Sequence, residues 1–133
     1  MTATKNVQPT SSRILVVDDE ALVRNMMCDG LAAAGYAVSA ASSGEEAMTL
    51  VQAERPACIL LDIMMPDLDG YDTCAALKAD PKTASIPVLL VSATTDGRVT
   101  VHAKRVGAGA VLRKPVRMDE LRRAITQALG TSA

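Results

Sequence analysis

Charged and hydroxyl side chains follow the apolar runs of this 133-residue chain. Asp18 and Asp19 come after the first run, and Asp62 ends a run near the middle of the chain. Ser92 and Lys114 end the next two runs. If these runs are neighbouring parallel strands, the five side chains meet at the carboxyl edge of one sheet, where open α/β sheets bind ligands. The sequence therefore predicts one site that combines carboxylates, a hydroxyl and an ammonium group.

The acidic part of this predicted site is suited to a metal ion. Carboxylates that converge at one edge repel one another, and protonation, a cation, or both relieve the repulsion. Oxygen ligands suit a hard divalent cation, above all Mg²⁺, which keeps several of its waters. His102 is the only histidine, which disfavours zinc. Asp18, Asp19 and Asp62 are therefore candidate Mg²⁺ ligands.

The same residues could carry out phosphoryl transfer. The Asp62 carboxylate can attack the phosphorus of a phosphodonor and form an aspartyl phosphate. Mg²⁺ would neutralise part of the incoming charge and template the in-line geometry. The Lys114 ammonium can pair with a second phosphoryl oxygen, and the Ser92 hydroxyl can donate to a third. Taken singly, each acidic residue is more simply a turn or cap residue. The functional interpretation gains because all of them fall at successive strand ends.

The elements that must position this site alternate between apolar runs and helical patterns five times, which predicts a parallel sheet covered by helices on both faces. The predicted strands are about 13–18, 36–40, 57–62, 88–92 and 110–113, and the predicted helices are about 23–34, 43–54, 70–79, 98–106 and 118–129. Ser42 and Glu45 fit a capping box before the second helix. Residues 1–12 and 131–133 are predicted to be flexible tails around one domain, 13–130.

Composition excludes several classes of protein. The net charge is −1, with 14 basic and 15 acidic residues, which argues against a nucleic-acid-coating or polybasic membrane-binding chain. Two tyrosines are the only aromatic residues, so base-stacking surfaces are not expected. Cys28, Cys58 and Cys74 lack C-x-x-C spacing and are predicted to be small buried hydrophobic residues. With no membrane-length apolar stretch and no secretion signal, we expect a cytoplasmic protein.

Five motifs in this order and spacing resemble the receiver domain of response regulators in bacterial two-component systems. The resemblance covers about residues 13–129. The motifs are Val17-Asp18-Asp19-Glu20, Leu61-Asp62-Ile63-Met64-Met65-Pro66-Asp67-Leu68-Asp69-Gly70, Ile86-Pro87-Val88-Leu89-Leu90-Val91-Ser92-Ala93, Gly107-Ala108-Gly109-Ala110 and Lys114-Pro115. The resemblance implies a doubly wound (βα)₅ flavodoxin-like sandwich of three layers, with strand order 2-1-3-4-5.

The resemblance also implies roles for the site residues. Asp62 is then the phosphoacceptor. Asp19 is a direct Mg²⁺ ligand, Asp18 acts mainly through water, and the Met64 backbone carbonyl is a further ligand. By the same resemblance, Ser92 is the hydroxyl that moves to meet the phosphoryl group, and Lys114 is the cation that pairs with it. A histidine kinase or a histidine phosphotransfer protein would supply the phosphoryl group. The domain itself would catalyse only its own phosphorylation and dephosphorylation.

Two departures from the family pattern concern signalling and lifetime. The family often has Tyr or Phe three residues before the lysine, where this chain has Val111. We therefore expect the fourth helix, weakened by its β-branched segment 99–101, to shift on phosphorylation instead. By resemblance, Met64 and Thr94 flank the attacking water, and Met64 offers no group to orient it. A moderate or long phosphoryl lifetime follows.

Other assignments remain open at this point. A haloacid-dehalogenase type phosphatase would need an acid at Met64, so it is disfavoured. A degenerate receiver that only binds proteins is argued against by the intact acidic set. Met1 and the short tail favour a stand-alone regulator, although a receiver from a longer multidomain regulator is equally compatible. The output face, which includes Val111, His102 and Arg113, would bind a downstream target protein or a second copy after phosphorylation.

Overall fold

The apolar runs form the five parallel strands of one sheet in a computed structural model that describes residues 13–94 and 96–130. The strands are β1 (Arg13–Val17), β2 (Ala37–Ala41), β3 (Cys58–Asp62), β4 (Val88–Ser92) and β5 (Ala110–Arg113). Their order is β2-β1-β3-β4-β5, and every neighbouring pair is parallel. This order confirms the prediction. The predicted tails, 1–12 and 131–133, lie outside the described residues.

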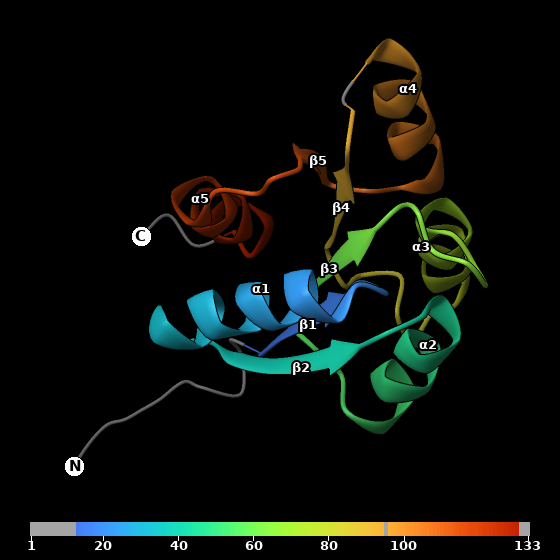
Figure 1. Ribbon diagram of the computed structural model, residues 1–133. Coiled ribbons are helices and arrows are strands. Elements are labelled where there is room, and N and C mark those ends of the chain that lie inside the picture. Colours follow the sequence, from blue (N-terminus) through green and yellow to red (C-terminus); the bar gives the residue numbers. More distant parts are fainter. Residues whose placement is uncertain (1–12, 95, 131–133) are drawn as a thin grey trace.

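Five helices cover the two faces of the sheet (Figure 1). They are α1 (Ala21–Ala33), α2 (Gly44–Ala53), α3 (Gly70–Ala79), α4 (Gly97–Val106) and α5 (Met118–Ala128). Helices α1 and α5 pack on one face, and α2, α3 and α4 pack on the other. The chain is therefore a (βα)₅ sandwich of three layers, as predicted.

The three inner strands form a rigid support for the site. Strands β3 and β4 are buried at every position, and β1 at all positions but its first. Their side chains alternate between the two faces: Leu15 and Ile59 join the core under α2 and α3, whereas Ile14 and Leu60 join the core under α1 and α5. Burial on both faces explains why these strands read as continuous apolar runs.

The capping box predicted at Ser42 and Glu45 is wrong by one residue. Ser43 is the N-cap of α2 and accepts a hydrogen bond from the Glu46 amide at 3.1 Å. The Glu46 carboxylate accepts from the Ser42 amide and hydroxyl instead. The Glu45 amide donates a hydrogen bond at 3.0 Å to the carboxylate of Asp67, which lies in a loop 22 residues further along the chain. The sequence fits both Ser42 with Glu45 and Ser43 with Glu46, so the local pattern alone does not decide between the two positions.

Helix α4 lies at one end of the molecule (Figure 1), and most of its residues are not buried. Ala103 is its one buried residue, and Val101 is 56% exposed. Asp96 caps its first turn by accepting from the Arg98 and Val99 amides. The His102 ring stacks on Tyr71 of α3 with ring centroids 3.6 Å apart. The helix is thus held by its cap and a narrow contact, which suits an element that can move.

The cysteines agree with the prediction of buried, unpaired thiols. Cys58 and Cys74 are buried, Cys28 is half-buried, and all three are free. Burial raises the pKa of Cys58 to about 12, which keeps it protonated and unreactive. In the ranges 13–94 and 96–130, the helices are too short or too polar to cross a membrane.

Candidate functional site

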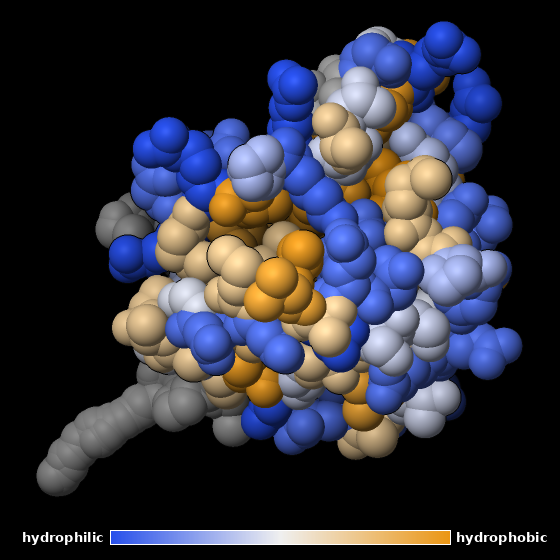
Figure 2. Space-filling view, in the orientation of Figure 1, coloured by the Kyte–Doolittle hydropathy of each residue, from blue (hydrophilic) through white to orange (hydrophobic). Residues whose placement is uncertain are grey.

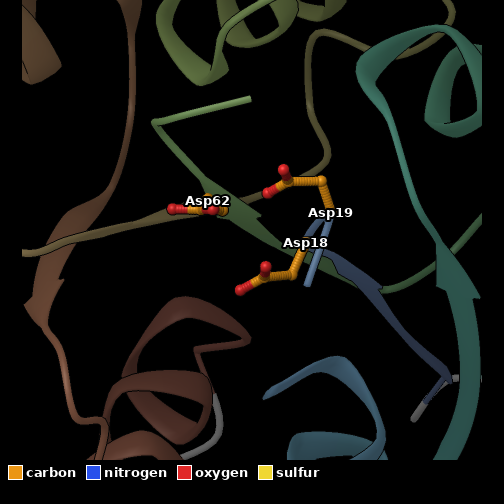
Figure 3. A group of neighbouring side chains, drawn as sticks. All are labelled: Asp18, Asp19 and Asp62. Carbon is orange, nitrogen blue, oxygen red and sulfur yellow. The ribbon is translucent and has the colours of Figure 1, made fainter. Parts of the chain in front are cut away.

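Three carboxylates converge where β1 and β3 end (Figure 3). Asp18, Asp19 and Asp62 each offer an oxygen within 4.8 Å of the others. Asp18 is 1% exposed and Asp62 is 4% exposed, whereas Asp19 faces solvent. In the described part of the chain, this is the group of acidic side chains arranged so that it could hold a metal ion. It consists of the three residues that the sequence singled out.

The pairing of β1 with β3 brings these residues together. Val17 lies opposite Leu61, so Asp18, which follows Val17, comes level with Asp62 at the end of β3. The turn after β1 is then fixed by hydrogen bonds on both sides of Asp18. Its Oδ1 accepts from the Glu20 amide at 2.9 Å, and its carbonyl accepts from the Arg24 guanidinium at 2.7 Å.

Lys114 enters the acidic cluster from the end of β5. Its Nζ lies 3.3 Å from Asp18 Oδ2, 3.3 Å from Asp62 Oδ1 and 3.9 Å from Glu20 Oε1. Burial alone would lower the pKa of Lys114, but the charges of Asp62 and Asp18 outweigh it, and the net shift is upward. The ammonium group is therefore charged at neutral pH and partly offsets the carboxylates.

One ammonium does not neutralise the whole cluster. Burial, and next the charge of Asp18, raise the pKa of Asp62, although Lys114 acts in the opposite direction. Asp18 Oδ2 is buried and lacks a hydrogen bond from any described residue, because its contact with Lys114 is an ion pair without hydrogen-bond geometry. A buried, unsatisfied carboxylate oxygen beside two further carboxylates fits a hard divalent cation. The residues present therefore suit Mg²⁺.

Ser92 lies at the end of β4, next to the strand that carries Asp62. Asp62 pairs with Val91 in the register of β3 and β4, so Ser92 sits one position further along. It is buried, and its hydroxyl accepts from the Thr94 amide at 3.2 Å. Its carbonyl accepts from the Lys114 amide at 2.8 Å. Ser92 and Lys114 are thus fixed to each other through the backbone at the same edge.

The loop that follows Asp62 is closed tightly over the end of β3. The Gly70 amide donates to the Ile63 carbonyl at 2.8 Å. A Cβ at Gly70 would lie 2.5 Å from the Asp62 carbonyl oxygen, so only glycine fits there without moving the strand. Met64, within this loop, projects outward and is 74% exposed. Its side chain stands at the rim of the site rather than in it.

The residues predicted for output lie away from the acidic cluster. Val111 is half-buried and packs against the core under α2 and α3. Arg113 and His102 are exposed, and His102 contacts Tyr71 rather than any site residue. Arg24 also supports the site, and the residue pattern does not reveal it because its partner is a backbone carbonyl rather than a charged side chain.

Exposed apolar side chains border the site on the α1 side. Leu22 is 73% exposed and Met26 is 64% exposed. A groove of about 490 Å³ runs beside them, and Figure 2 shows apolar residues gathered on this face. The residues that line the groove are Val23, Met26, Met27, Lys114, Pro115, Val116 and Met118. The groove thus connects α1 to the lysine that contacts the acidic cluster.

The chain is similar in sequence to one family of known proteins. The response regulator receiver domain family matches residues 14–126, which include every residue of the acidic cluster. The chain is 38% identical over 109 residues to the response regulator MprA of Mycolicibacterium vanbaalenii, covering 82% of this chain and 46% of the relative. It is 43% identical over 107 residues to the response regulator PleD of Caulobacter vibrioides, covering 80% and 23%. The chain thus spans less than half the length of these relatives.

Solved structures agree with this comparison. The chemotaxis protein CheY4 of Vibrio cholerae superimposes with a TM-score of 0.84 at 29% identity, over 88% of this chain and 98% of that one. The signal receiver domain of a signal transduction histidine kinase from Syntrophus aciditrophicus gives 0.83 at 30% identity, over 91% and 92%. The likeness therefore extends over nearly the whole described fold.

Proposed function

Because this chain belongs to the response regulator receiver family of two-component signalling, we propose that Asp62 accepts a phosphoryl group and that this modification switches the binding of a partner protein. The observation that carries the proposal is the position of Asp62, which ends β3 beside the Lys114 ammonium and the Asp18 and Asp19 carboxylates. A nucleophile, a cation and candidate metal ligands therefore lie together at the carboxyl edge of the sheet.

In the proposed reaction, a carboxylate oxygen of Asp62 attacks the phosphorus of a phosphohistidine. The new O–P bond forms as the P–N bond to the imidazole breaks, and the imidazole takes a proton from solvent. Asp18, Asp19, Asp62 and the Met64 carbonyl would hold Mg²⁺, which would neutralise part of the phosphoryl charge when bound. Lys114 loses one carboxylate partner and pairs with a phosphoryl oxygen instead.

Ser92 completes the proposed site from the neighbouring strand. In the unphosphorylated chain its hydroxyl accepts from the Thr94 amide, which leaves its proton free to be donated. On phosphorylation the hydroxyl turns to a third phosphoryl oxygen, and the segment after β4 moves with it. That segment leads directly into α4, so the movement reaches the helix with the smallest buried contact.

The chain has no separate substrate in this proposal. Its catalysis is limited to its own phosphorylation and the later hydrolysis of the aspartyl phosphate. A phosphatase of the haloacid-dehalogenase type would need a carboxylic acid two residues after the nucleophile. That position is Met64, whose thioether cannot donate a proton.

The phosphodonor is proposed to be a histidine kinase or a histidine phosphotransfer protein. Its phosphohistidine must come within bonding reach of Asp62, so the donor has to cover the rim of the site. The rim exposes Leu22, Met26 and Met64, and exposed apolar groups of this kind mark protein-binding surfaces. Methionine side chains also adapt easily to a partner. We therefore place the donor against α1 and the adjacent groove.

The output is proposed to be a protein contact in the cytoplasm, either with a downstream target or with a second phosphorylated copy. Phosphorylation of Asp62 would change the surface beside α4, which includes His102, Val111 and Arg113. Since the chain spans only part of its curated relatives, the target could equally belong to the same longer polypeptide.

The decisive experiment is intact mass spectrometry after incubation with Mg²⁺ and acetyl phosphate. We expect one phosphoryl adduct on the wild type, none with EDTA, and none on Asp62→Asn. An adduct on both proteins would place the modification elsewhere. No adduct on the wild type, even from a phosphorylated histidine kinase, would contradict the proposal and favour a receiver that only binds partners.

A further inference from the structure

The loop after Asp62 is tied to a second element by Asp67. One carboxylate oxygen of Asp67 accepts from the Gly44 amide at 3.3 Å, and the other accepts from the Glu45 amide at 3.0 Å. Both amides are in the first turn of α2, where the helix leaves N–H groups without internal partners. The Asp67 carboxylate thus caps α2 from 22 residues away in sequence. The hydrogen bonds from Glu45 and Leu68 lower the pKa of Asp67, so it is ionised at neutral pH.

The contact between the loop and α2 is close as well as polar. A Cβ at Gly44 would lie 2.8 Å from the Leu68 carbonyl oxygen and 2.9 Å from the Leu68 Cβ. The loop therefore packs its backbone directly on the first residue of α2. Asp67 adds two hydrogen bonds at the same place. The middle of the loop is therefore held to α2 both by packing and by hydrogen bonds.

The two ends of the loop are held independently. The Gly70 amide bonds to the Ile63 carbonyl, and Asp69 caps α3 by accepting from the Asp72 amide at 2.8 Å. Between these ends, Met64 has an exposed side chain, so packing of that side chain contributes little to the position of its backbone. On either side of Met64, Ile63 is buried and Met65 packs against the core under α2 and α3. The contacts of Asp67 and Leu68 with α2 hold the part of the loop that follows.

We propose that Asp67 is a positioning residue for the metal site: by anchoring the loop to α2, it holds the Met64 carbonyl in place to bind Mg²⁺. The inference rests on the proposed function, because it takes the Met64 carbonyl as a metal ligand. Asp67 itself does not touch the metal. Its carboxylate is already occupied by two amides, and it acts through the backbone of the loop. Outer partners of this kind affect metal affinity because they limit how far a ligand can move.

The experiment is a Mg²⁺ titration of the full chain, without phosphodonor, by isothermal calorimetry and by amide shifts of residues 63–68. For Asp67→Ala we expect roughly a tenfold rise in the Mg²⁺ Kd, the lower end of the effect of outer-shell partners. Asp67→Asn keeps one acceptor oxygen and should recover part of the affinity. Thermal denaturation of each variant reports whether it is folded.

The matched control is Ser43→Ala. It removes the other side-chain cap of α2, the bond to the Glu46 amide, without releasing the loop. We expect it to lower the melting temperature about as much as Asp67→Ala does while leaving the Mg²⁺ Kd unchanged. An unchanged Kd in Asp67→Ala, or an equal rise in Ser43→Ala, would overturn the inference alone. A wild type that does not bind Mg²⁺ would overturn the proposed function with it.

Discussion

Lys114 Nζ lies 3.3 Å from Asp62 Oδ1, and both groups are attached to strand ends that are two strands apart in the sheet. Asp18 contacts the same ammonium at the same distance. A single cation thus serves two buried carboxylates, and it is itself only 22% exposed. The site therefore keeps an excess of negative charge that a metal ion would offset, and this excess sets the first two predictions.

Removing the cation should destabilise the fold most strongly near neutral pH. Lys114→Ala leaves Asp18 and Asp62 without their partner, which we expect to cost about 2–4 kcal/mol, somewhat below a fully buried pair because Lys114 is partly exposed. Lys114→Met keeps most of the side-chain volume and separates lost charge from lost packing. Denaturant unfolding in EDTA measures the difference.

The pH dependence of that difference has a defined sign. The raised pKa of Lys114 means that its contribution is complete below the unfolded value of about 10.4 and is lost as the pH rises through the folded value. The raised pKa of Asp62 means that the folded state gains stability as the pH falls towards it. The loss of unfolding free energy caused by Lys114→Ala should therefore be smaller at both alkaline and acidic pH. A deficit independent of pH would point to lost packing instead.

Neutralising Asp62 should stabilise the metal-free protein. Burial and the charge of Asp18 disfavour the ionised form of Asp62, so Asp62→Asn removes an unfavourable charge while keeping the shape. We expect the free energy of unfolding in EDTA to rise by about 1 kcal/mol, a common size for a single stabilising substitution. Asp29→Asn, an exposed acid on α1, is the control and should change little. Excess Mg²⁺ should reduce the difference in unfolding free energy between Asp62→Asn and the wild type, because Mg²⁺ binds the wild type better.

Charging the apolar rim should separate protein donors from small donors. We expect Met26→Asp to slow phosphotransfer from a cognate histidine kinase at least roughly tenfold, as loss of an interface anchor does. Phosphorylation by acetyl phosphate should continue at the wild-type rate, because Met26 does not contact the acidic cluster. Val101→Asp places the same charge on exposed α4 and is the matched control. Equal loss with both donors would mean that the site itself had been disturbed.

Phosphorylation should move α4. Val111 stands in place of an aromatic side chain, and α4, with Ala103 alone buried, is the helix with the fewest buried residues. We expect amide shifts along residues 97–106 when the phosphoryl mimic beryllofluoride is added with Mg²⁺, measured by NMR, and smaller shifts in α1 and α5. Unchanged α4 shifts would rule out this route of coupling.

The aspartyl phosphate should have a moderate or long lifetime rather than a very short one. Met64 is exposed at the rim and cannot orient a water, and Thr94 offers only a hydroxyl. Met64→Asn supplies an amide at that position, and we expect hydrolysis to be several-fold faster, of the order of one positioned hydrogen bond. The decay of the adduct after removal of donor measures the rate. A Met64→Leu variant should decay like the wild type.

The family resemblance implied the sheet order, and the residue pattern predicted the bounds of β4, β5 and α3 and the residues of the acidic cluster. The bounds and the cluster could be predicted because each depends on local information: a continuous apolar run, a polar residue at its end, or a proline that stops a helix. The start of α2 was misplaced by one residue because Ser42 and Ser43 are both followed three residues later by a glutamate. The contact of Asp67 with the Gly44 and Glu45 amides had no local signal, because Asp67 comes from a distant loop. The role of Arg24 was missed because Asp18 accepts its hydrogen bond through a backbone carbonyl.

The stack of Tyr71 on His102 also gives the protein a built-in optical probe. The chain has no tryptophan or phenylalanine, so its near-ultraviolet absorption and circular dichroism arise from Tyr71 and Tyr36. Tyr36 packs against the core under α1 and α5, whereas Tyr71 lies where α3 meets α4. A Tyr36→Leu protein would therefore carry one chromophore, positioned where the switch should act. Movement of α4 could then be followed by spectroscopy in real time, without an attached dye.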